Sequence, residues 1–175
     1  MKAYYHDNRD DVDQREPHFG GEELTPDQLK DIGVLYYHCN DIDSVDKIAE
    51  ERNYVSRDVI QITPEKLGGP EAYAEKLRTF YAEHLHEDEE IRYILEGEGY
   101  FDVREKNDRW VRCALETGDL LILPAGIYHR FTLTSKDYVK ALRLFKEQPR
   151  WVAINRPIAD DNPYRSEYLT SIAAN

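Results

Sequence analysis

The strongest constraint on the fold is a series of short apolar segments, separated by turn residues, in the second half of the chain. Segments rich in Ile, Leu, Val and aromatic residues alternate there with short runs of Gly, Pro, Asn and Asp. Turn signals at intervals of about eight to twelve residues are typical of an antiparallel sandwich or small barrel. We therefore predict strands over residues 91–96, 100–105, 109–115, 120–123, 127–133 and 138–145, with a turn in each gap.

The first half of the chain carries helix signals as well as strand signals. Thr25, followed by Pro26 and Gln28, forms a capping box with proline at the first helical position, which predicts a short helix to about residue 32. Ser44 can cap a second helix to about residue 52, and the apolar spacing after Pro70 predicts a third. We also expect short strands at 3–5 and 34–37, a polar loop through residue 21 and a short helical piece before residue 70. This half is thus predicted to be mixed and mostly helical.

Nothing between the halves resembles a linker, and the sequence has no internal repeat. A chain of 175 residues fits one domain. We predict a single domain over 1–175, with a mixed N-terminal part at 1–82, a β-barrel core at 83–146 and a C-terminal tail at 147–175.

The charge balance limits the partners of the protein. The formal net charge is −12, so the surface repels the phosphates of nucleic acids and of anionic membranes. No segment approaches the roughly 18 apolar residues of a membrane span, and no apolar run follows the first methionine. Cys39 and Cys113 are far apart in the sequence and suit free thiols in a reducing compartment. We expect an intracellular, cytoplasmic protein, with a nuclear location left open, that binds neither nucleic acid nor membrane.

Four residues of the β region have the side chains and spacing of metal ligands. His84 and His86 lie two residues apart, on one face of an extended chain, and Glu90 follows at an even offset. His129 lies in the strand predicted after Gly126. Three imidazoles and one carboxylate suit Fe, Ni, Co, Mn or Zn better than Ca or Mg. A His-x-His pair in an acidic run is more often a solvated strand edge, so the pair alone would not establish a metal site.

The spacing around these residues resembles the two sequence motifs of the cupins. His84, His86, Glu90 and Gly97 match the first motif, and Gly118, Pro124, Gly126 and His129 match the second. Two positions depart from the motifs, since Arg78 replaces a glycine and Leu133 replaces an asparagine, but neither is a ligand. The resemblance implies a mainly β fold with helices, namely a cupin (double-stranded β-helix, or jelly-roll) barrel with a partly helical N-terminal part.

Within the cupins, the sequence is similar to the acireductone dioxygenases of eukaryotic type. The similarity is most specific over residues 83–95, 99–104 and 123–131. It implies an enzyme of methionine salvage that holds one Fe(II) or Ni(II) per chain and reacts 1,2-dihydroxy-3-keto-5-methylthiopentene with O2. In that family Fe(II) gives formate and the keto-acid precursor of methionine, whereas Ni(II) gives methylthiopropionate, formate and carbon monoxide.

Arg92 is a candidate catalytic and substrate-binding residue. It lies two positions after Glu90, so strand alternation directs it into the same interior, where a guanidinium needs an anionic partner. An ion pair with a nearby acidic residue is the alternative explanation. The family resemblance implies that Arg92 faces the substrate and that Phe80, Phe131 and Trp151 line its pocket, although the sequence alone indicates core aromatics for Phe80 and Trp151.

The other histidines, the acidic run and the cysteines indicate no further chemistry. We expect His6, His18 and His38 on the surface or in loops, residues 87–89 in a solvated loop, and Cys113 in the core. Two other functions remain open: a different dioxygenase or isomerase on the same metal centre, or a regulatory cupin that binds metal without turnover. Family members are also reported to bind proteins, so protein partners are expected by resemblance only.

Overall fold

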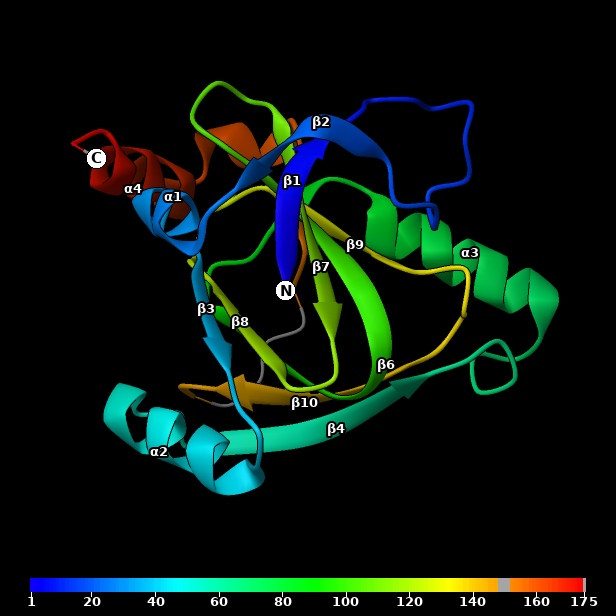
Figure 1. The fold of residues 1–175 in the computed structure, drawn as a ribbon. Helices are drawn as coiled ribbons and strands as arrows, with labels where there is room; N and C mark the ends of the chain where they lie inside the picture. Colours follow the sequence, from blue (N-terminus) through cyan, green and yellow to red (C-terminus); the bar gives the residue numbers. More distant parts are fainter. Residues whose placement is uncertain (148–151, 175) are drawn as a thin grey trace.

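The fold consists of two β-sheets that share one long strand (Figure 1). The structure is a computed structural model, and it describes residues 1–147 and 152–174. The shared strand is β6 (Glu90–Arg104). In the large sheet the order is β11-β5-β9-β6-β7-β1-β2, and in the small sheet β10 and β8 flank β6, with β4 outside β10 and β3 outside β8. The other strands are β1 (Lys2–His6), β2 (Phe19–Leu24), β3 (Leu35–His38), β4 (Ser56–Ile62), β5 (His84–Leu85), β7 (Trp110–Glu116), β8 (Asp119–Leu123), β9 (His129–Leu133), β10 (Val139–Phe145) and β11 (Ile154–Asn155).

The mainly β architecture predicted from the second half is confirmed. The strands predicted at 109–115, 120–123 and 138–145 appear as β7, β8 and β10, shifted by about one residue. The strand predicted from residue 127 begins at His129, because Ile127 donates its backbone N–H to the Pro124 carbonyl and closes a turn. All the pairings between strands are antiparallel, as the short turns require.

The turn predicted at 97–99 is wrong, because residues 90–104 form one continuous strand. The first part of β6 pairs with β10 and β8, and its second part pairs with β7 and β9, so β6 crosses from one sheet to the other. Gly97 lies at the crossing with a φ of 77°, and a Cβ atom there would lie 2.3 Å from the Tyr138 carbonyl oxygen. The glycine is therefore required by a close approach of Tyr138, the residue before β10, rather than by a reversal of the chain.

The three helices predicted in the first half are confirmed as α1 (Pro26–Asp31), α2 (Ile42–Arg52) and α3 (Pro70–Tyr81). The Thr25 capping box has both of its hydrogen bonds. Ser44 is not the cap of α2, however. The cap is Asp41, which accepts hydrogen bonds from the backbone and the hydroxyl of Ser44, and an Asp carboxylate is as good an N-cap as a serine.

The first half contains more strand than predicted. The polar loop contains β2, which lies exposed at the edge of the large sheet, and residues 56–62 form β4 at the edge of the small sheet. Residues 64–69 form turns instead of a short helical piece. The predicted tail carries β11, a 3-10 helix (Ile158–Asp161) and α4 (Pro163–Ile172). Asn162 caps α4 before Pro163, a start signal that the sequence contained.

The main core lies between the two sheets and is continued by α1, α3 and α4. Leu133, which replaces the motif asparagine, is completely buried, as is Cys113. Both cysteines are free thiols, as expected. The Tyr168 hydroxyl of α4 donates to the Ile32 carbonyl and joins the C-terminal helix to α1 (Figure 1). No helix among the described residues is long and apolar enough to cross a membrane.

Candidate metal centre

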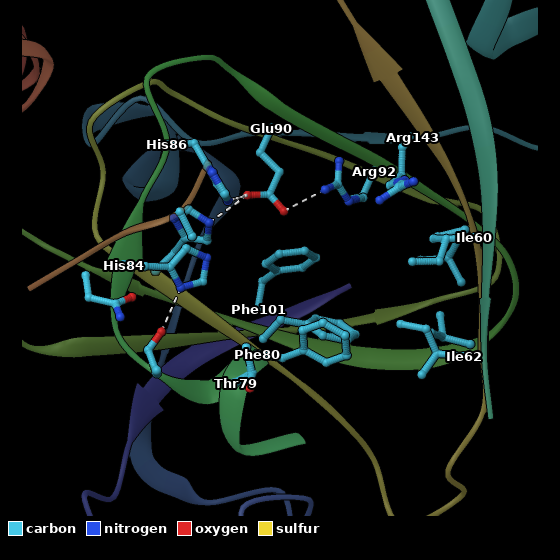
Figure 2. Close-up of a pocket in the computed structure, with 18 residues that line it drawn as sticks. Ile60, Ile62, Thr79, Phe80, His84, His86, Glu90, Arg92, Phe101 and Arg143 are labelled. Carbon is cyan, nitrogen blue, oxygen red and sulfur yellow. Dashed lines mark hydrogen bonds and ion pairs between the residues drawn. The ribbon is translucent and has the colours of Figure 1, made fainter. Parts of the chain in front are cut away.

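The four predicted ligand residues lie together at one end of the interior, held by three strands. His84 belongs to β5 and lies directly opposite His129, the first residue of β9. Glu90 is the first residue of β6, and His86 lies in the short segment between β5 and β6. The coordinating atoms of the three histidines all lie within 4.8 Å of one another. Figure 2 shows His84, His86 and Glu90 on one side of the pocket.

Backbone hydrogen bonds fix the same tautomer in all three imidazoles. The Nδ1 atoms of His84, His86 and His129 lie 2.7, 2.8 and 3.0 Å from the carbonyl oxygens of Ala82, Val152 and Ile127. A carbonyl oxygen can only accept, so each Nδ1 carries a proton and donates it. Burial lowers the pKa of His84 to about 4, so its ring is neutral near pH 7. The Nε2 lone pairs are therefore available to a metal.

The carboxylate of Glu90 faces these lone pairs. Its Oε2 atom lies 2.6 Å from the Nε2 atom of His129 and 3.5 Å from that of His86. Burial raises the pKa of Glu90, but Arg92 and His129 outweigh it and hold the pKa well below the usual range of a carboxyl. Among the described residues, Glu90 Oε2 and His129 Nε2 are the buried side-chain atoms without a hydrogen-bond partner. Two acceptors this close repel one another unless a cation lies between them, so the residues fit a bound metal ion.

Arg92 points into the interior, as strand alternation predicted. Its Nη2 atom lies 3.0 Å from Glu90 Oε1, and its Nη1 atom donates to the Ile91 carbonyl. Glu90 thus offers one oxygen to the metal position and the other to Arg92. Burial lowers the pKa of Arg92, whereas Glu90 raises it. The ion pair considered as the alternative explanation is present, and its partner is a candidate metal ligand.

The candidate ligands open onto a cavity of about 510 Å³. Phe80 and Phe131 both line it, with ring centroids 6.2 Å apart in an edge-to-face arrangement. Trp151, the third predicted pocket aromatic, lies outside the described residues. Figure 2 shows Phe80 and Phe101 along the middle of the cavity, between the histidines and the isoleucines of β4.

Several lining residues were not predicted from the sequence. Ile60 and Ile62 come from β4, a strand that was missed, although alternate positions of this segment face the interior. Phe101 lies on β6 beyond the crossing, 4.9 Å from the ring centroid of Phe131. Arg143 lies on β10, whose strand was predicted, and counting alternate positions along β10 would have placed it on the inner face.

His6 and His18 are buried, and His6 lies in β1, so the surface or loop location predicted for His6 is wrong. His18 lies in a loop and His38 is exposed, as expected. The rings of His6 and His18 stack with centroids 4.5 Å apart. With Asp7 they form a second cluster of possible metal donors. His6 Nδ1 accepts from the Asn8 backbone, and both nitrogens of His18 face oxygen acceptors. One ion cannot lie in the planes of two stacked rings, so this cluster is hydrogen-bonded structure.

The acidic run at 87–89 is less solvated than predicted. Glu89 accepts hydrogen bonds from Arg52 and Tyr54, and Glu87 accepts one from the side-chain amide of Asn162. Asp88 is exposed. These contacts anchor the segment between β5 and β6, which contains His86.

Comparisons with known proteins give a consistent result. Residues 2–153 match the model of the ARD/ARD' family. The chain is 60% identical over 174 residues to an acireductone dioxygenase of Yarrowia lipolytica, covering 99% of this chain and 100% of that protein. It is 53% identical to one of Saccharomyces cerevisiae, covering 98% of each. A solved acireductone dioxygenase from Bacillus anthracis, with a cadmium ion in its active centre, has a similar fold, with a TM-score of 0.68 and 23% identity over 87% of this chain and 96% of that one.

Proposed function

Because the chain belongs to the acireductone dioxygenase family, we propose that it is a metal-dependent dioxygenase that cleaves an acireductone with O2. The proposal covers residues 1–175 as one catalytic domain. The observation that carries it is the pair of unsatisfied buried acceptors, Glu90 Oε2 and His129 Nε2, at the end of a cavity large enough for a small molecule.

We assign one Fe(II) or Ni(II) per chain to His84, His86, Glu90 and His129. Nitrogen and carboxylate donors suit both ions. When bound, the ion would act as a Lewis acid and hold the substrate anion next to O2. We propose that Fe(II) gives formate and the methylthio keto acid, and that Ni(II) gives methylthiopropionate, formate and carbon monoxide.

The remaining residues would bind and orient the substrate. Arg92 lies beside the ligand Glu90 and can donate to an oxygen of an enediolate, a charge-assisted hydrogen bond. Phe80 and Phe131 offer apolar surface to the alkylthio chain and exclude water. We assign Trp151 to the same pocket from the family resemblance alone.

The charge and the free thiols of the protein support a proposal for its partners and its location in the cell. The acidic surface supports small-molecule substrates and O2 as partners, without nucleic acid or membrane. Two buried free thiols support a cytoplasmic location, with the nucleus and protein partners left open.

The experiment is a metal exchange with product identification. The metal-free protein is loaded anaerobically with Fe(II) or Ni(II), mixed with the acireductone, and exposed to O2. Formate with keto acid from the Fe(II) form, and carbon monoxide from the Ni(II) form, would support the proposal. Loaded protein that consumes no O2 above background would favour a regulatory cupin without turnover, and different products would favour another dioxygenase.

A further inference from the structure

Three charged side chains form a row across the small sheet, directly above the cavity. In the strand register Asp58 of β4 lies opposite Arg143 of β10, and Arg143 lies opposite Arg92 of β6. Arg92 and Arg143 both line the cavity next to the candidate metal centre. Figure 2 shows them side by side, with Glu90 toward the histidines and Ile60 on the other side.

The pairing of the two arginines is unfavourable by itself. Side chains directly opposite on antiparallel strands have Cβ atoms about 5 Å apart, and like charges in such a pair are destabilising. Both side chains are largely enclosed, with 17% exposure for Arg143 and 18% for Arg92, so water screens this repulsion only partly.

Asp58 fixes the position of Arg143. The Nε and Nη2 atoms of Arg143 each donate to one carboxylate oxygen of Asp58, both at 2.7 Å. This two-point contact sets the plane of the guanidinium, which is the geometry that arginine uses to present hydrogen bonds to an anion.

The charges in the row balance only while no cation is bound. Asp58 offsets Arg143, and Glu90 offsets Arg92. A divalent ion bound to Glu90 would draw on the negative charge of this carboxylate. Arg92 would then be less offset, and this side of the cavity would carry a net positive charge. An anion in the cavity would restore the balance, with its negative atoms between the metal position and the two guanidinium groups.

The polarity of the wall changes beyond Arg143. Ile60 lies opposite Ala141 and Ile62 lies opposite Val139 on β4 and β10, and all four line the cavity. A ligand with oxygens at one end and an apolar chain at the other is therefore oriented, with its oxygens toward the arginines and its chain toward β4.

From this arrangement we infer that Arg143 is a second substrate-binding arginine, which donates to the substrate oxygen farthest from the metal. The inference rests on the proposed function. An acireductone has three oxygens on adjacent carbons. Chelation of a metal through the two enediol oxygens, on C1 and C2, would leave the C3 oxygen on the side of the alkyl chain, where Arg143 follows Arg92 in the row.

The test compares Arg143→Met with Arg143→Lys, Asp58→Asn and a control, Arg57→Met. Arg57 is adjacent to Asp58 in sequence, and its Nη1 atom lies 2.6 Å from Asp46 in an exposed ion pair outside the cavity. Metal content, steady-state kinetics and anaerobic dissociation constants for the acireductone, followed by its absorbance, are measured for each Ni(II)-loaded protein.

We expect Arg143→Met to keep its metal and to weaken anaerobic binding by about tenfold to a hundredfold, the effect of one charge-assisted hydrogen bond. Arg143→Lys should recover part of the loss, Asp58→Asn should lose less than Arg143→Met, and Arg57→Met should match the wild type. The inference would be overturned if Asp58→Asn and Arg143→Met lost substrate affinity equally, or if Arg143→Met lost none. In either case, turnover by the wild type would still support the proposed function. A wild-type protein that neither binds nor consumes the acireductone would overturn both.

Discussion

Replacing His86 with alanine tests the ligand set and the independence of the fold from the metal. The side chain is 24% exposed and donates one hydrogen bond, from Nδ1 to the Val152 carbonyl at 2.8 Å. Losing this hydrogen bond lowers the free energy of unfolding by about 1 kcal/mol, and losing the partly buried ring lowers it by about another 1 kcal/mol. For a chain of this length, about 2 kcal/mol lowers the Tm of the metal-free protein by roughly 4–8 °C. The variant should therefore still fold.

The effect on the metal-bound protein should be larger. At a metal concentration about 1,000 times Kd, binding stabilises the wild type by about 4 kcal/mol, or roughly 8–16 °C. If loss of one ligand weakens affinity about 100-fold, the same metal concentration contributes only about 1.4 kcal/mol, or roughly 3–6 °C. Activity should fall with metal content.

The assay is thermal unfolding with and without Ni(II), together with metal analysis and O2 uptake. His38→Ala is the matched control, since the His38 side chain is 53% exposed and lies outside the site. Two results would refute the reasoning. A His86→Ala variant with the wild-type metal shift and full activity would remove His86 from the ligand set. A variant that is unfolded without metal would show that the core depends on the ion.

Three further predictions concern Arg92, the buried charges and acid stability. Arg92→Ala should keep its metal but lower kcat/KM about tenfold or more, and unchanged kinetics would reduce Arg92 to a structural partner of Glu90. Arg112→Met should destabilise the protein by about 3–5 kcal/mol in denaturant titration, because Arg112 is completely buried and binds both oxygens of Asp102. Burial lowers the pKa of His6 from 6.5 to about 4, so below pH 6.5 the unfolded chain takes up a proton that the folded chain refuses. Stability should fall between pH 6.5 and about 4, by up to about 1.4 kcal/mol per pH unit. His6→Phe should flatten this slope in denaturant titrations across that range, and an unchanged slope would assign the loss to other groups.

The parts of the fold set by local turn chemistry could be predicted from the sequence. The strands β7, β8 and β10 follow from apolar runs between Gly, Asn, Asp and Pro residues. The crossing at Gly97 could not, because the same residue type that marks a turn is required there by the nearby carbonyl of Tyr138, the residue before β10. Such close approaches depend on tertiary structure.

The edge strands and the buried histidines show a second limit. β2 is polar and exposed, so its strand character comes from its pairing with β1 and not from burial. The burial of His6 comes from packing near Arg112 and Tyr81, which are distant in sequence, and the ring of His18 stacks on that of His6. Hydrophobic periodicity carries no information on either feature.

The candidate site was largely predictable because ligand spacing is local. His84, His86 and Glu90 lie within seven residues, and the motif around His129 supplied the last candidate ligand. Ile60 was missed because it lies on β4, which was not predicted as a strand. Arg143 lies on β10, a predicted strand, and counting alternate positions along β10 would have found it.

The most direct test of the central claim is a titration of metal-free protein with Fe(II), followed by O2 uptake in the presence of the acireductone. The four-residue site predicts that the rate rises linearly with added Fe(II) and reaches a plateau at about one ion per chain. It also predicts that His129→Ala shows no such rise over the same range. O2 uptake that does not depend on Fe(II), or that is the same in His129→Ala, would contradict the account.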